Sequence, residues 1–126
     1  MALSPEQDRD PRPPALRLLP LFGNDERALA RALRVWPWRL RRWITGRRPP
    51  RKYRERLEDL LALVQMMPAE WSPEEIRSWL QGPNDYLRGN TPLELVRRGA
   101  TGEVVQAASH LKRTLRDPTP PAQTGL

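Results

Sequence analysis

Apolar residues recur at steps of three and four positions along most of this chain, which is the period of one face of an α-helix. The clearest stripe predicts a helix, the longest of the chain, that opens at Pro50 or Arg51 and is ended by Pro68. Its apolar positions are Tyr53, Leu57, Leu60, Leu61, Val64 and Met67. Leucine dominates the apolar residues whereas valine and isoleucine are few, a balance that favours helix over strand. The pattern therefore predicts an all-α fold.

Two helix starts in the second half of the chain carry the same capping signal. The segments Ser72-Pro73-Glu74-Glu75 and Thr91-Pro92-Leu93-Glu94 each place a hydroxyl before a proline and a glutamate three positions after the hydroxyl. The hydroxyl can accept from the backbone amide of the glutamate, and the glutamate side chain can accept from the backbone amide of the hydroxyl residue. Both segments therefore predict capping boxes. The helices that they open are expected over residues 73–80 and 92–98. A third helix should start near Thr101, with one face made by Val104, Ala108, Leu111 and Leu115.

The first half of the chain predicts two short helices separated by a tight turn. Asp25 suits the N-cap of a helix that runs through Leu33. Pro37 suits the first turn of a second helix, which should stop at Gly46. A break near residues 34–36 separates the two, and this spacing is that of a helix-turn-helix.

Positive charge is concentrated in the first half of the chain. The net charge is +7, but residues 1–56 hold 15 basic and 6 acidic side chains, whereas residues 57–126 hold 7 basic and 9 acidic ones. Within residues 39–56 there are 9 basic residues and one acid, Glu55. A concentrated basic stripe suggests a polyanionic partner, most often nucleic acid. A solvated arginine-rich surface would have the same composition, and composition alone does not separate the two.

Catalytic and metal-binding chemistry have little support in the composition. There is no cysteine and His110 is the one histidine, so a cysteine nucleophile and a histidine-based metal cluster are both excluded. No glycine-rich phosphate loop occurs, and the adjacent carboxylates Glu58-Asp59 and Glu74-Glu75 point apart on a helix. We therefore expect a binding protein without a cofactor or a metal, rather than an enzyme.

Both ends of the chain are rich in proline and polar residues. Residues 1–14 predict a flexible arm, and residues 116–126 predict a flexible tail. The N-terminal residues do not form a charged and then apolar leader, and no apolar run approaches about 20 residues, the length of a membrane span. A cytoplasmic protein without membrane contact is expected, which agrees with the lack of cysteine.

A set of small, apolar and basic residues in the first half follows a known order: Leu29-Ala30, Leu33, Val35, Arg42-Trp43, Gly46, and Pro49 or Pro50. With this order, residues 15–67 resemble the Xre-type DNA-binding domain. The resemblance implies that the second short helix is a recognition helix for double-stranded DNA. The residues that it would turn outward are Trp38, Arg39, Arg41 and Arg42. The residues expected to flank the DNA backbone are Arg47, Arg48, Arg51 and Lys52.

Aromatic residues occupy the start of this helix, where base-reading side chains would stand. Trp36, Pro37 and Trp38 offer few hydrogen bonds to base edges, so phosphate contact is expected more than sequence readout. Trp43 is expected in the core, and core packing is also favoured for Trp36. Trp38 is left open between a DNA-facing and a protein-facing position.

The second half carries a longer ordered motif, WL..PN..L.G.TP.EL...G....V. Its residues include Trp79, Leu80, Pro83, Asn84, Leu87, Gly89, Thr91, Pro92, Leu93 and Gly99. With this motif, residues 70–115 are similar to the toxin-binding domain of the Xre/MbcA/ParS antitoxin family. The resemblance implies a type II antitoxin that binds a RES-domain toxin, an enzyme that degrades or uses NAD⁺, and blocks its active site. It also implies binding of promoter DNA for autoregulation.

The motif residues are expected to define the fold more than to touch the partner, with Asn84 capping or turning the chain locally. Toxin contact is expected from the outer face of the last helix, at Gln106, Ser109, His110, Lys112 and Arg113. The expected architecture is a helix-turn-helix bundle followed by a small helical toxin-binding domain, assembled as a homo-oligomer or with its toxin as a hetero-oligomer. Two alternatives stay open: a stand-alone helix-turn-helix transcriptional regulator, and a first half that dimerises through Trp36 and Trp38.

Overall fold

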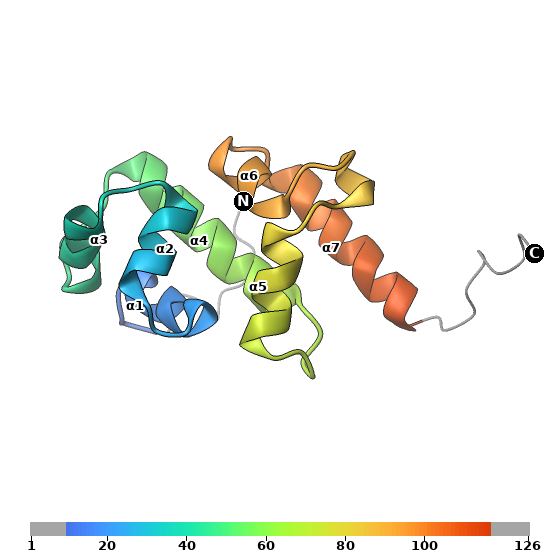
Figure 1. Ribbon diagram of the computed structural model, residues 1–126, viewed down its shortest axis with the longest axis horizontal. Coiled ribbons are helices and arrows are strands. Elements are labelled where there is room, and N and C mark those ends of the chain that lie inside the picture. Colours follow the sequence, from blue (N-terminus) through green and yellow to red (C-terminus); the bar gives the residue numbers. More distant parts are fainter. Residues whose placement is uncertain (1–9, 117–126) are drawn as a thin grey trace, which may run out of the picture.

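The structure, a computed structural model, describes residues 10–116 of the chain (Figure 1). Its α-helices, and the 3₁₀ helices marked η, are α1 (Pro14–Leu18), η2 (Leu19–Phe22), α2 (Glu26–Leu33), α3 (Pro37–Ile44), α4 (Arg51–Met66), α5 (Pro73–Gln81), η3 (Asp85–Leu87), α6 (Pro92–Arg97) and α7 (Thr101–Arg116). No strand occurs within residues 10–116, and the all-α prediction is confirmed. The predicted tail from residue 117 onward and residues 1–9 of the predicted arm lie outside the described residues.

Helix α4 forms the centre of the fold. It runs between α1, α2 and α3 on one side and α5, α6 and α7 on the other (Figure 1), and it packs against α1, α6 and α7. Leu57, Leu60 and Leu61 of the predicted stripe are buried. Ala62 and Leu63 are buried as well, because neighbouring helices cover α4 on more than one side. The prediction that this helix is the longest is wrong, since α4 and α7 both have 16 residues.

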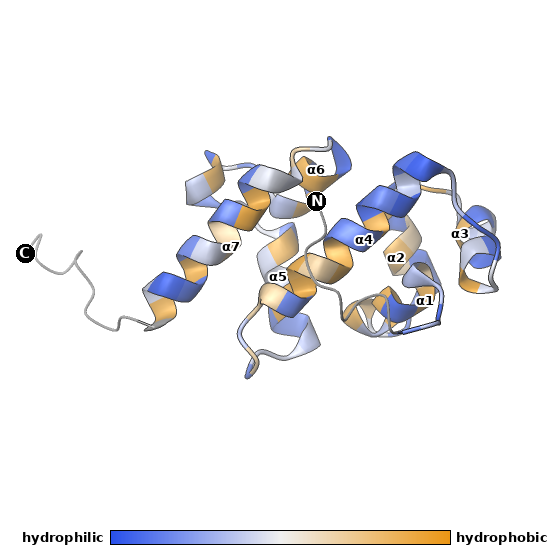
Figure 2. Cartoon of the chain, turned by 180° about the vertical axis from the view of Figure 1, so that it is seen from behind, coloured by the Kyte–Doolittle hydropathy of each residue, from blue (hydrophilic) through white to orange (hydrophobic). Residues whose placement is uncertain are grey.

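The buried residues of both halves belong to one hydrophobic core. The cluster extends from Ala15 in α1 through the leucines of α4 to Val104 and Ala108 in α7. Figure 2 shows hydrophobic and hydrophilic residues alternating along α2, α4 and α7, as expected for helices with one buried face. Contacts of α5 with η2 and of α7 with α4 join the two groups of helices. The predicted boundary between residues 15–67 and 70–115 falls in the loop between α4 and α5, and the core continues across it.

A non-glycine residue in the left-handed conformation closes the turn between α2 and α3. Arg34 has a φ of 59°, and its amide donates to the carbonyl of Arg31 at 3.1 Å. The amide of Val35 donates to the carbonyl of Ala30 at 3.0 Å. These two bonds form a Schellman motif, which usually places glycine at this position because the left-handed conformation strains other residues.

Arg34→Gly should therefore raise the free energy of unfolding by about 0.5–1 kcal/mol, because relief of the strain outweighs the added freedom of glycine in the unfolded chain. The ion pair lost with Glu94 is long, at 3.6 Å, and the arginine is exposed, so it contributes little. Arg31→Gly, within α2, is the control and should lower stability by about 1 kcal/mol. Thermal unfolding measures both, and a shift of the same sign for both variants would contradict the assignment of strain to Arg34.

The predicted helix caps form to different extents. In α5 the box is complete: Ser72 Oγ accepts from the amide of Glu75 at 3.2 Å, and Glu75 Oε1 accepts from the amide of Ser72 at 2.7 Å. In α6, Thr91 Oγ1 accepts from the amide of Glu94 at 3.1 Å, but the Glu94 carboxylate contacts arginines instead of reaching back. The prediction of a second complete box is wrong. Asp25 caps α2 as predicted, by accepting from two amides of the first turn.

The last turns of α7 run out beyond the other helices (Figure 1). Val104 and Ala108 are buried as predicted and Leu111 is partly buried, but Leu115 is 50% exposed. Among the α7 side chains that the structure describes, none after Ala108 is buried. The predicted apolar face of this helix therefore ends before Leu115, because no other helix covers that turn.

Candidate partner-binding surfaces

Two tryptophans at the start of α3 are the most exposed large apolar side chains within residues 10–116. Trp36 is 70% exposed and Trp38 is 61% exposed. Helix α3 buries Leu40 and Trp43 instead, and the prediction of a buried Trp43 is confirmed. The preference for a buried Trp36 is wrong, because Trp36 is the N-cap of α3 and precedes the turn whose side chains reach the core.

The exposed side of α3 carries three of the predicted DNA contacts. Trp38, Arg41 and Arg42 are spaced by three and four positions, so they share one face of the helix. The guanidinium of Arg41 lies 3.3 Å from the carboxylate of Glu26 in α2. The side chain of Arg42 is exposed and has no hydrogen-bond or ion-pair partner among the described residues. This face therefore combines an apolar ring with at least one guanidinium that is free to bind.

Arg39 lies against two aromatic rings. Its guanidinium carbon is 5.7 Å from the ring centroid of Trp43 and 5.2 Å from that of Tyr53. The two ring centroids are themselves 5.2 Å apart. Cation–π contacts of this kind attach α3 to the first turn of α4, and a role of Arg39 on DNA would compete with them.

The other predicted DNA contacts follow α3 directly. Arg47 and Arg48 are exposed in the loop between α3 and α4, and Arg51 and Lys52 lie in the first turn of α4. Arg51 forms an ion pair with Glu55 at 3.2 Å. The first turn of α4 has no acidic residue, so these cations add to the positive end of the helix dipole. The structure thus gathers the predicted DNA contacts at one end of the molecule, at the left of Figure 1.

The backbone of Asn84 closes the loop between α5 and α6. Its amide donates to the carbonyl of Asn90 at 3.1 Å, and its carbonyl accepts from the amides of Leu87 and Gly89 at 3.0 and 2.8 Å. Gly89 has a φ of 86°, which favours glycine. The expected turn at Asn84 is present in its backbone, while its side chain makes no capping hydrogen bond to η3.

Four of the remaining motif residues face the core, and two others, Trp79 and Pro83, line a groove. Leu80, Leu87, Pro92 and Leu93 are buried, Thr91 caps α6, and Gly99 has a φ of 87°. A groove of about 490 Å³ separates the loop after α5 from α7. The residues that line this groove include Trp79, Pro83, Asn84, Tyr86, His110 and Leu111.

A stacked aromatic pair forms one wall of this groove. Tyr86 is 48% exposed, and its ring stacks on His110 with centroids 4.9 Å apart and an angle of 27° between the ring planes. Sequence reasoning missed Tyr86. The signal that could have found it is an aromatic residue in a short polar loop, two positions after the Pro83-Asn84 turn.

The residues predicted to contact a toxin lie on two adjoining faces of α7. Gln106, His110 and Arg113 are exposed and share one face by their spacing. Lys112 is also exposed, whereas Ser109 is partly buried. Of these five, His110 is the one that lines the groove.

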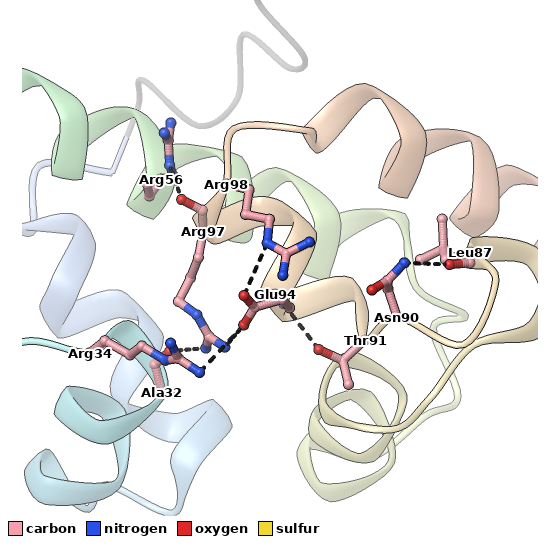
Figure 3. Close-up of polar contacts among 9 residues, drawn as sticks. All are labelled: Ala32, Arg34, Arg56, Leu87, Asn90, Thr91, Glu94, Arg97 and Arg98. Atoms are coloured by element: carbon pink, nitrogen blue, oxygen red, sulfur yellow. Dashed lines mark hydrogen bonds and ion pairs between the residues drawn. The ribbon is translucent and has the colours of Figure 1, made fainter.

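Three arginines converge on Glu94 at the junction of α2 and α6 (Figure 3). Arg97 pairs with it from the last residue of α6, and Arg98 pairs with it from the C-cap of that helix at 3.2 Å. Arg34 reaches it from the turn after α2 at 3.6 Å. The hydrogen bond from Arg97 and the positive charges of the three guanidinium groups lower the pKa of the Glu94 carboxyl, against the opposing effect of burial. Arg97 also donates to the carbonyl of Ala32 at 2.6 Å, so it ties α6 to the end of α2.

Arg97→Ala should lower the free energy of unfolding by about 2 kcal/mol, because it leaves the Ala32 carbonyl unpaired and removes an aliphatic stem from between α2 and α6. The Arg97 side chain is 20% exposed, whereas that of Arg98 is 61% exposed. Arg98→Ala removes a second arginine from the same carboxylate and is the matched control, with an expected loss below about 0.5 kcal/mol. Urea denaturation compares the two, and equal losses would contradict the role given to Arg97.

Within residues 10–116, no group of three or more histidines and carboxylates is placed to hold a metal ion. None of the described helices has the length and apolar character that crossing a bilayer requires. The features that stand out are the exposed tryptophans and arginines at α3, and the Tyr86–His110 pair beside α7.

The chain has a relative with an assigned role. A protein of Mycobacterium tuberculosis, named "Probable mycobacterial cidal antitoxin", is 30% identical to it over 87 residues, which are 69% of this chain and 75% of that protein. This chain belongs to the same antitoxin family. The prediction of an antitoxin is confirmed at that level. No family model matches this chain, and no solved structure matches it.

Proposed function

We propose that this antitoxin neutralises a RES-domain toxin by covering the toxin's active site with α7 and the groove beside it. Family membership supports a toxin partner, and the motif of residues 70–115 supports a toxin of the RES type. The observation that carries the placement is the groove with its exposed, stacked Tyr86–His110 pair. In this proposal the protein acts in the cytoplasm by binding, without catalysis and without a cofactor.

The groove has the composition of an interface centre. Tyrosine and tryptophan contribute much of the binding energy at protein interfaces, from the middle of a patch with a polar rim. Tyr86 and Trp79 would form this centre, and the exposed Gln106, Lys112 and Arg113 of α7 would form the rim. A stable interface buries about 800 Å² on each partner, so the groove needs the outer face of α7 beside it.

Co-expression tests the proposal. Cells that produce a RES-domain toxin encoded beside the antitoxin gene should stop growing and lose NAD⁺, and cells that also produce the antitoxin should grow. An affinity tag on the antitoxin should recover the toxin. If neither a complex nor rescue is observed, the proposal fails. Rescue through a complex with a toxin of another fold would keep the antitoxin role and refute the RES partner.

We also propose that α3 and the segment after it bind double-stranded promoter DNA. The support is the exposed face with Trp38, Arg41 and Arg42, followed by the exposed Arg47 and Arg48. Guanidinium groups bind phosphates through paired hydrogen bonds, so this surface suits the DNA backbone. A stand-alone transcriptional regulator would use the same surface. It would differ in the co-expression test, where it would neither bind the toxin nor rescue growth.

The salt dependence of binding tests this surface. If Arg41 and Arg42 contact phosphates, R41A/R42A should flatten the plot of log affinity against log salt by about 1.8, close to one unit for each lost contact. K112A/R113A removes the same charge from α7, at the other end of the molecule in Figure 1, and should keep the slope. A slope unchanged in R41A/R42A would contradict the placement.

The two exposed tryptophans also offer a surface through which copies of the antitoxin could associate. As the alternative to DNA contact by the Trp38 face, we propose a homo-oligomer through Trp36 and Trp38, which are apolar and 70% and 61% exposed. Light scattering of W36A/W38A tests this, with a smaller particle expected than for the native chain. An oligomer that stays intact would place the contact elsewhere and refute this proposal.

A further inference from the structure

Four arginines from three helical segments meet around one cleft. The cleft, of about 660 Å³, lies between α2, α5 and α6. The polar residues that line it are Arg31, Arg34, Arg77, Gln81, Thr91 and Arg97. They are up to 66 positions apart in the sequence, so the fold alone brings these guanidinium groups together.

This cleft holds many more hydrogen-bond donors than acceptors. Each guanidinium carries five N–H donors. Arg77 donates to the carbonyl of Leu21 at 3.1 Å, and Arg97 donates to the carbonyl of Ala32 and to Glu94. The Glu94 carboxylate is shared between the cleft residues Arg34 and Arg97 and the neighbouring Arg98.

Arg31 is the least engaged of the four. Its side chain is exposed and has no hydrogen-bond or ion-pair partner within the described part of the chain. It also lines the neighbouring pocket of about 840 Å³, together with Arg27, Arg34 and Trp36. A continuous basic surface therefore leads from the cleft to the start of α3.

We propose that this cleft binds a phosphate group. A phosphate offers several charged oxygens to guanidinium groups that approach from different elements, and each planar guanidinium can hold two of them. Two sources share this chemistry: a phosphodiester of duplex DNA and a small phosphorylated molecule. In the first case the cleft extends the DNA surface proposed above and rests on that proposal; in the second it is independent of it.

Inorganic pyrophosphate tests the cleft directly. At about ten times its dissociation constant, it should raise the melting temperature of the native chain by about 5 °C above sodium chloride of equal ionic strength. Arg31→Gln should abolish most of this shift without harming the fold, because Arg31 has no partner to lose. Arg12→Gln is the control, since Arg12 lies before α1 and does not line the cleft. Its side chain is 60% exposed and pairs with Asp10. No shift in the native chain, or equal shifts in both variants, would refute the proposal.

A mixed-sequence duplex of about 16 base pairs separates the two sources. If the cleft holds a DNA phosphate, R31Q should flatten the salt slope by about 0.9, R12Q should not, and pyrophosphate should compete with the duplex. If R31Q loses the pyrophosphate effect and keeps the native slope, the source is a small molecule. If the native chain binds no duplex yet is stabilised by pyrophosphate, the DNA proposal fails and the cleft stands. If R31Q weakens toxin binding with no effect of pyrophosphate, the cleft holds an acidic protein segment and the inference is wrong.

Discussion

Leu63→Ala should lower the free energy of unfolding by about 3 kcal/mol and the melting temperature by about 15 °C. Leu63 is 0% exposed in the fourth turn of α4, the helix that lies between the two groups of helices. Truncation removes apolar surface from the core and leaves a cavity that the surrounding helices cannot fill without moving. Circular dichroism during heating and in urea measures the loss.

Leu115→Ala is the matched control for this variant, because it deletes the same atoms from a leucine that is 50% exposed. Its expected cost is below about 0.5 kcal/mol. The variant at Leu63 also tests the shared core, since both groups of helices should unfold in one transition. Two transitions, of which Leu63→Ala moves one, would show that residues 15–67 and 70–115 are independent domains.

Features set by neighbouring residues were predictable from the sequence. The helix starts at Asp25 and Ser72 depend on a side chain and amides two or three positions away, so local spacing is sufficient to identify them. The same reasoning gave a second complete box at Thr91 and was wrong there. Glu94 has the right spacing, but its charge-assisted contacts with three arginines are stronger than a contact with one backbone amide. One of those arginines, Arg34, is 60 positions away, where no local pattern could indicate it.

The extent to which each helix is buried was predicted least well. Ala62 and Leu63 lie off the predicted stripe of α4 and are buried because helices cover more than one of its sides. Leu115 continues the stripe of α7 and is exposed because nothing covers that turn. Helical periodicity tells which residues share a face, and tertiary packing decides how far along a helix that face is covered.

In the candidate sites, too, local spacing predicts some groupings of residues, and tertiary packing alone produces the others. Trp38, Arg41 and Arg42 share a face of one short helix, so their grouping followed from spacing. The Tyr86–His110 pair joins η3 to α7 across 24 positions of the sequence, and the arginine cleft joins α2, α5 and α6. Arg39 was expected to point outward, and its contacts with Trp43 and Tyr53 depend on how α3 meets α4.

Tyr86→Ala should weaken toxin binding by about 30-fold, or about 2 kcal/mol, if the groove beside α7 is the centre of the interface. The substitution removes the aromatic wall that stacks on His110, and it leaves that ring without a partner in the groove. Surface plasmon resonance with immobilised toxin measures the affinity. The faster dissociation should carry most of the change, as is usual when a contact is removed from a formed interface.

Tyr86→Phe is the control that separates the ring from the hydroxyl, and it should stay within about threefold of the native affinity because the stacked ring is kept. Both variants should melt close to the native temperature, since Tyr86 is 48% exposed and caps no helix. A native affinity for Tyr86→Ala would exclude the groove from the interface centre. The outer face of α7 would then be examined by Q106A/R113A, whose two residues share that face and lie outside the groove. Neutralisation that survives this double variant as well would refute the placement of the toxin on α7.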